Sequence, residues 1–135
     1  MKPRHALVEV KALARAFLEG DEAAVAFSAP GASIKRVVRV LLCSEIEAVG
    51  TILNGVLKLD EATFSRSFVQ WEMVVDEYGL ENFLGHNWYV KLAIGDENGH
   101  RLLDEISFHP LERPMRVKDG RLLGVTFTTK SKGEV

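Results

Sequence analysis

Four side chains between residues 66 and 109 carry the groups that metal-free RNA cleavage uses. Arg66 offers a fixed fork for a phosphate, Lys91 a second cation, and Tyr89 a phenol for hydrogen bonding or base stacking. His109 can act as an acid or a base near neutral pH. Cleavage requires a base for the 2′-OH, an acid for the leaving 5′ oxygen, and cations for the phosphorane.

We therefore expect Arg66, Tyr89 and His109 to be catalytic. Lys91, Tyr78 and Arg101 are the candidates for RNA binding. Because side chains alternate along a strand, Tyr89 and Lys91 should share one face, and that face is the less apolar one.

Each candidate also has an ordinary structural explanation. His109 precedes Pro110 and can be a surface or capping residue. Arg66 can be solvated or ion-paired, with Asp60 or Glu61 as partner. Tyr89 and Lys91 can be the outward side of a half-exposed strand, while Trp71 and Trp88 are expected to be core anchors.

Other kinds of site have little support in the sequence. The four histidines, His5, His86, His100 and His109, show no metal-ligand spacing, and Cys43 is the only cysteine, in an apolar run. No nucleotide-binding glycine motif and no nucleophile-elbow motif is present. We expect no metal and no cofactor.

The net charge of −2 over 135 residues argues mildly against nonspecific nucleic-acid binding. The charge is unevenly distributed, because residues 46–85 contain two cations, Lys58 and Arg66, against seven acids. The composition is that of one domain, and no uninterrupted apolar run is long enough to span a membrane. A cytoplasmic location is the expectation.

The first half of the chain has helical periodicity. One helix is predicted between His5 and Leu18, ending before Gly20. A short helix or turn follows over residues 21–31. Ser33 is then the expected cap of a second helix, with a buried strand as the alternative. A break is expected near Gly50.

The prediction for residues 60–71 is a third helix that starts at Asp60. It would turn Phe64 and Phe68 inward and leave Arg66 on another face.

The second half has strand periodicity. Strand-like runs are VVDEY, residues 87–94 and residues 101–109, and the last two are joined by a turn over Gly95 to Gly99. Short strands are predicted over residues 115–117 and in LLGVTFTT.

We predict a single α+β domain, helical over 5–70 with an antiparallel sheet over 72–129 and a frayed tail over 130–135.

The order of these segments resembles a known family. The runs GVLKLDEATFSRSF, VVDEY, NWYVKLAI and EISFHPLE, and the opening KPRHALVEVKAL, are similar to the MqsR-type (motility quorum-sensing regulator) toxins, which are bacterial mRNA interferases. The similarity extends over residues 3–112 and is better over 56–112. It implies a RelE-like fold, single-stranded mRNA as substrate, and an antitoxin protein as partner.

The family's site residues fall on particular positions of this chain. Its helical lysine falls on Arg66, its sheet tyrosine on Tyr89 and its C-terminal lysine on His109. Its glutamine falls on Val75, which cannot hydrogen-bond through its side chain. The chain also continues beyond the family's usual end, from Arg113 onward.

Two other classes of function remain open. One is a noncatalytic protein-binding module, either an antitoxin-like or immunity protein or a degenerate toxin fold. It is favoured by the missing glutamine and by the acids that would suit a basic partner, Glu72, Asp76, Glu77 and Glu81. The other is a small-ligand enzyme, and its only support is that helices precede strands in the chain. A homodimer is also possible.

Overall fold

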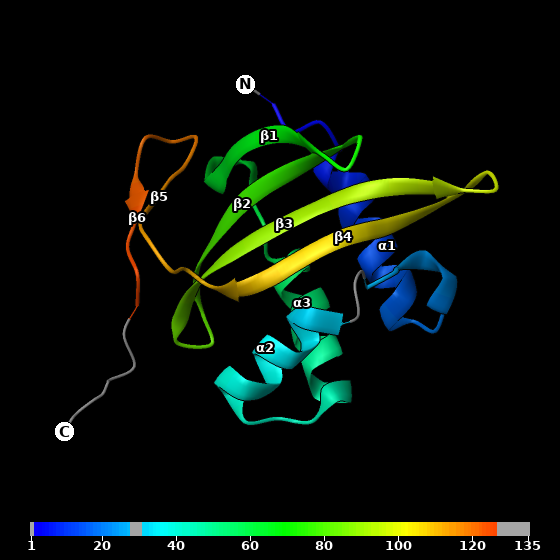
Figure 1. Cartoon of the computed structure of the whole chain (residues 1–135), viewed down its shortest axis with the longest axis horizontal. Helices are drawn as coiled ribbons and strands as arrows, with labels where there is room; N and C mark the ends of the chain where they lie inside the picture. Colours follow the sequence, from blue (N-terminus) through cyan, green and yellow to red (C-terminus); the bar gives the residue numbers. More distant parts are fainter. Residues whose placement is uncertain (1, 28–30, 127–135) are drawn as a thin grey trace.

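The structure, a computed structural model, describes residues 2–27 and 31–126. Within these ranges three α-helices come first: α1 (Leu7–Leu18), α2 (Ala32–Leu41) and α3 (Glu45–Leu57). A four-stranded antiparallel sheet follows, and Figure 1 shows the helices gathered on one side of it. The predicted α+β class is confirmed.

The sheet is a meander in the order β1-β2-β3-β4. Its strands are β1 (Phe64–Gln70), β2 (Met73–Phe83), β3 (His86–Glu97) and β4 (His100–Pro110). The predicted turn between β3 and β4 is present but shorter, since only Asn98 and Gly99 lie between the strands, both with positive φ.

The hydrophobic core lies between the helices and one face of the sheet. Trp88 and Phe108 are fully buried there, with ring centroids 4.8 Å apart, as the prediction for Trp88 required. Val10, Val37 and Ile52 of the helices belong to the same cluster. No helix of the described residues covers the opposite face, and we call it the open face.

The helix boundaries correct two expectations. Helix α3 runs without interruption through Gly50, and the break lies instead at Leu42–Ser44, where Ser44 and Glu47 form a capping box. Ser33 does not cap α2, which begins at Ala32. Its hydroxyl donates to the Ile106 carbonyl and accepts from the Phe108 amide, so it joins α2 to β4.

The helix predicted over residues 60–71 is wrong. Asp60 caps only a 3₁₀ turn, Glu61–Thr63, and the chain then enters β1. The four-residue spacing of Phe64 and Phe68 fits both a helix and a strand, which explains the error. Phe64 is in the core as predicted, but a bulge after it turns Phe68 to the other face, where its ring contacts the Arg66 guanidinium. Pairing with β2 decides for the strand, so the sheet begins at residue 64 and not at 72.

After β4 the chain folds back over one end of the open face. The two-stranded ribbon of β5 (Met115–Arg116) and β6 (Leu122–Leu123) lies at the end of the sheet away from the β3–β4 turn (Figure 1). It does not join the main sheet, contrary to the prediction of one sheet over 72–129. The part of that prediction beyond residue 126, and the frayed tail, lie outside the described residues.

Close contact between this ribbon and the sheet depends on Gly79. A Cβ at Gly79 would overlap the Leu123 side chain and lie 3.5 Å from the Met115 sulfur. Leu111, Met115, Val117 and Leu123 form a second small apolar cluster at this point. Because glycine has no side chain at this position of β2, the ribbon can pack closely against the sheet.

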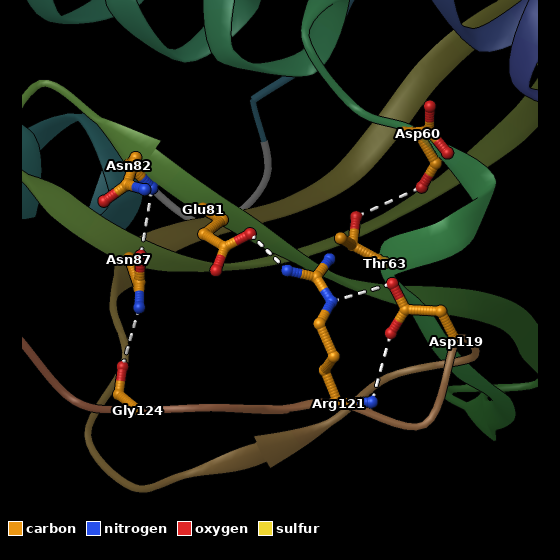
Figure 2. Close-up of polar contacts among 8 residues, drawn as sticks. All are labelled: Asp60, Thr63, Glu81, Asn82, Asn87, Asp119, Arg121 and Gly124. Atoms are coloured by element: carbon orange, nitrogen blue, oxygen red, sulfur yellow. Dashed lines mark hydrogen bonds and ion pairs between the residues drawn. The ribbon is translucent and has the colours of Figure 1, made fainter.

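Polar contacts fasten the ribbon at its sides (Figure 2). The Arg121 guanidinium donates to Glu81 at 2.7 Å and to Asp119 at 2.8 Å. The Asn87 amide donates to the Gly124 carbonyl at 2.9 Å. These contacts hold the ribbon in place over one end of the open face.

Among the described residues no single helix has the length and apolar character to cross a membrane, although α2 and α3, bent by 100°, meet those criteria as a pair.

Candidate active site on the open face

The structure brings the three residues predicted to be catalytic to one cavity of about 570 Å³. The cavity lies between the open face and the segment that leads to the ribbon. Its lining consists of Arg66, Glu77, Tyr89, His109, Leu111, Glu112, Arg113, Pro114 and Met115.

Strand alternation and register explain why these side chains meet. Arg66 of β1 pairs with Glu77 of β2, and Tyr89 of β3 pairs with His109 of β4. A bulge between Phe64 and Arg66 shifts the alternation of β1, so Phe64 is buried in the core and Arg66 is on the open face. Four adjacent strands thus contribute one polar residue each.

Glu77 is the centre of this cluster. Its side chain is only 11% exposed and accepts from Arg66 Nε at 2.8 Å and from the Tyr89 hydroxyl at 2.5 Å. The hydrogen bond and charge of Glu77 raise the pKa of Arg66, which stays a cation. Because Nε is the atom that contacts Glu77, the two terminal nitrogens of the guanidinium remain available for a phosphate.

Tyr89 is held as a hydrogen-bond donor. Its ring packs against the small cluster beneath the ribbon, and burial, together with the bond to Glu77, raises its pKa well above the usual value. The phenol is therefore protonated at neutral pH and orients one oxygen of Glu77.

His109 is fixed in position and in tautomer. Its ring stacks on Tyr89 with centroids 5.0 Å apart and an interplanar angle of 24°. Nδ1 lies 2.8 Å from the Pro110 carbonyl, an acceptor, so Nδ1 carries a hydrogen and donates. Nε2 has no hydrogen-bond partner among the described residues and is the atom available for proton transfer.

Further charges surround His109. The hydrogen bond from Arg36, and then the charge of His109, lower the pKa of Glu112. Arg36 contacts the Glu112 carboxylate at 2.8 Å, which ties the cavity rim to α2. Arg113 lies on the same rim and adds a cation that sequence reasoning had not singled out.

The predicted RNA-binding residues do not all belong to this cluster. Lys91 is on the open face as predicted, in register with Glu77, and donates to Gln70 at 2.7 Å in a neighbouring groove. Arg101 lies near the β3–β4 turn and forms an ion pair with Glu9 of α1, away from the cavity.

Tyr78 requires a correction. It is 0% exposed on the core face, 5.5 Å from Phe64 between ring centroids. Its hydroxyl is buried without a hydrogen-bond partner among the described residues. The phenol is therefore inaccessible to RNA in this structure, because alternation places it on the side opposite Tyr89.

Glu77 is the residue that sequence reasoning missed as a member of the site. It adjoins Asp76, and alternation sends the two acids to opposite faces. Asp76 is fully buried and accepts from the backbone amides of Arg4 and His5. The sequence did contain one signal for Glu77. It lies two residues after Val75, the position of the family's glutamine, and residues two apart on a strand share a face.

The chain matches no family model, no curated protein and no solved structure. The argument for function therefore rests on the site itself. Among the described residues no group of histidine, cysteine, aspartate and glutamate side chains is arranged to hold a metal ion.

Proposed function

We propose that this protein is a metal-independent endoribonuclease that cleaves single-stranded mRNA. The observation that carries the proposal is the convergence of a carboxylate, an imidazole and a guanidinium on one cavity, from Glu77, His109 and Arg66. These are a base, an acid and a phosphate clamp, the three functions that transesterification of RNA requires.

The proposed reaction moves two protons. Glu77 accepts the proton of the 2′-OH as the 2′ oxygen forms a bond to phosphorus. The bond from phosphorus to the 5′ oxygen breaks, and protonated His109 donates from Nε2 to the leaving oxygen. The products are a 2′,3′-cyclic phosphate and a 5′-hydroxyl, with no metal in any step.

Arg66 and Tyr89 have supporting roles in this scheme. The terminal nitrogens of Arg66 hold two phosphate oxygens while Nε keeps its bond to Glu77. The Tyr89 hydroxyl donates to Oε2 of Glu77 and Arg66 Nε donates to Oε1. Together these two contacts fix the orientation of the carboxylate. The family's glutamine falls on Val75, which has no polar side chain. Glu77 lies on the same face of β2 and can supply a polar group in its place.

The biological role that fits such an activity is that of the toxin in a type II toxin–antitoxin pair. The similarity of residues 56–112 to the MqsR-type toxins supports this role, although Arg66 lies on strand β1 and the corresponding lysine of that family is on a helix. An unregulated mRNA-cleaving enzyme would stop growth, so a cognate antitoxin protein is the expected partner.

Expression in a bacterial host tests the proposal. Wild-type protein should arrest growth and create new RNA 5′ ends, and the double variant Arg66→Ala/His109→Ala should do neither. Arg39→Ala/His100→Ala is the matched control, because it removes the same residue types from exposed positions outside the cavity. Normal growth and unchanged RNA ends with wild type would contradict the proposal.

A second candidate is a noncatalytic protein-binding module. The observation in its favour is that Glu77 is satisfied by Arg66 and Tyr89 without any ligand. Against it, two of the four acids expected to meet a basic partner, Asp76 and Glu77, are buried. Two results together would favour this candidate: the purified protein binds a partner protein, and it does not cleave RNA when a chelator has removed metal ions.

A further inference from the structure

A second groove lies at the margin of the open face, beside the start of α2. It has a volume of about 190 Å³ and is lined by Gln70, Trp71, Lys91, Glu105, Ile106 and Ser107 of the sheet region and by Ala32 and Ser33 of α2. Lys91 is two residues from Tyr89 on β3, and Ser107 is two residues from His109 on β4. Two residues of a strand span about 6.6 Å, so the groove begins one such step from the cavity.

Trp71 is the unusual residue in this groove. It was expected in the core, but it is 83% exposed, whereas the other tryptophan, Trp88, is 0% exposed. Because the ring is exposed and lines a groove, it is accessible to a ligand that could cover its apolar surface.

The backbone around Trp71 is also unusual. Trp71 and Glu72 form the two-residue turn between β1 and β2, with φ of 54° and 63°. Such turns favour asparagine and glycine, because larger residues are strained at positive φ. Glu105, across the groove in a bulge of β4, has φ of 54°. Strain of this kind gathers at functional sites.

The groove has the groups that bind a single-stranded nucleotide. The Trp71 ring offers a stacking surface for a base, and the Lys91 ammonium a cation for a phosphate. Lys91 is held by Gln70 at 2.7 Å and lies beside Glu77 in register. The Glu105 carboxylate offers an acceptor for an amino or imino group on the base edge.

We propose that this groove is a subsite for the nucleotide next to the scissile phosphate, with its base stacked on Trp71 and its phosphate held by Lys91. The proposal rests on the ribonuclease function proposed above and extends it from one phosphate to a track of single-stranded RNA. It makes Trp71 a residue that favours longer substrates over dinucleotides.

Cleavage of two substrates by purified protein tests the subsite. The quantity is the ratio of kcat/KM for a hexanucleotide to kcat/KM for a dinucleotide. Trp71→Ala should lower this ratio on the order of 10-fold, and Trp71→Phe much less, because an aromatic ring still stacks. Val69→Ala, which truncates a neighbouring side chain that is 70% exposed, should leave the ratio unchanged. An unchanged ratio with Trp71→Ala would overturn the proposal.

Tryptophan fluorescence separates this proposal from the proposed function. A hexanucleotide with 2′-deoxy sugars cannot be cleaved by attack of a 2′-OH, and it should quench wild-type protein but not Trp71→Phe, whose remaining Trp88 is buried. Quenching without cleavage of RNA by wild type would refute the ribonuclease and keep the nucleotide groove. Cleavage without quenching would keep the ribonuclease and refute the groove.

Discussion

The two faces of the β-sheet differ in what their side chains do, although the same strands supply both. On the core face Trp88, Val90 and Phe108 are fully buried against the helices. On the open face Tyr89 and His109, their immediate neighbours in sequence, line a cavity with polar partners. One residue along the chain thus separates a side chain of the core from a side chain of the candidate site.

The difference follows from what covers each face. Three helices exclude water from the core face, so burial of apolar area stabilises it. The open face is covered at one end by the β5–β6 ribbon and has a cavity at its margin. Charged groups there are partly desolvated but reachable, the setting in which acid–base groups are effective.

Substitution of the proposed acid–base pair should have the largest effect, and that effect should be on activity. Glu77→Gln and His109→Gln should each lower kcat for RNA by about 100- to 10,000-fold, because each removes one proton transfer. Initial rates on a dinucleotide in chelator measure this. Glu22→Gln and His100→Gln, at exposed positions, are the matched controls, and equal rates for all four variants would contradict the assignment.

The complementary change on the core face should affect stability. Phe108→Ala should lower the free energy of unfolding by about 3–5 kcal/mol, because the cavity it leaves is enclosed by Trp88 and α3. Urea denaturation followed by circular dichroism gives the value. A loss as small as that of Val69→Ala, an exposed position, would show that the two faces do not differ as described.

Gly79 tests whether the ribbon covers the open face. Gly79→Val should destabilise by about 1–3 kcal/mol, because the new side chain overlaps Leu123. Gly79→Ala should cost less, since the end of the Leu123 side chain can move. In a double-mutant cycle Leu123→Ala should recover part of the loss, and strictly additive values would mean that the two residues do not interact.

The two tyrosines should show the smallest effect, at alkaline pH. Burial raises the pKa of both Tyr78 and Tyr89, one on each face. The unfolded chain ionises at about pH 10 and the folded chain does not, so stability is intact below that pH and falls as pH rises above it. Absorbance near 295 nm should report tyrosinate only as the protein unfolds. Ionisation of one tyrosine near pH 10 in the folded state would contradict the burial of that residue.

Several features of the fold could be predicted from local sequence. The amphipathic pattern of α1 and the alternation of residues 87–94 both identify elements that are present. Their apolar residues repeat at one period only. Residues 64–70 were misassigned because Phe64 and Phe68 fit two periods, and partner strand β2 decides between them.

The candidate site shows the same limit. Arg66, Tyr89 and His109 could be selected by residue type, and alternation placed Tyr89 and Lys91 on one face. Glu77 was not selected, because residue type does not distinguish it from Asp76. Its two-residue spacing from Val75 becomes informative only once both are placed on the same strand. Trp71 was expected in the core because aromatic residues usually are buried, and only the turn at the end of β1 shows otherwise.

The sequence by itself determined which residue types are available, the period of each unambiguous segment, and hence the α+β class. Tertiary structure decided which face of each strand the helices cover, that Gly79 admits the ribbon, and that Arg66, Glu77, Tyr89 and His109 meet across four strands. The physical reason is that local periodicity fixes the direction of a side chain relative to its own strand, whereas register and layer packing depend on residues far apart in the chain.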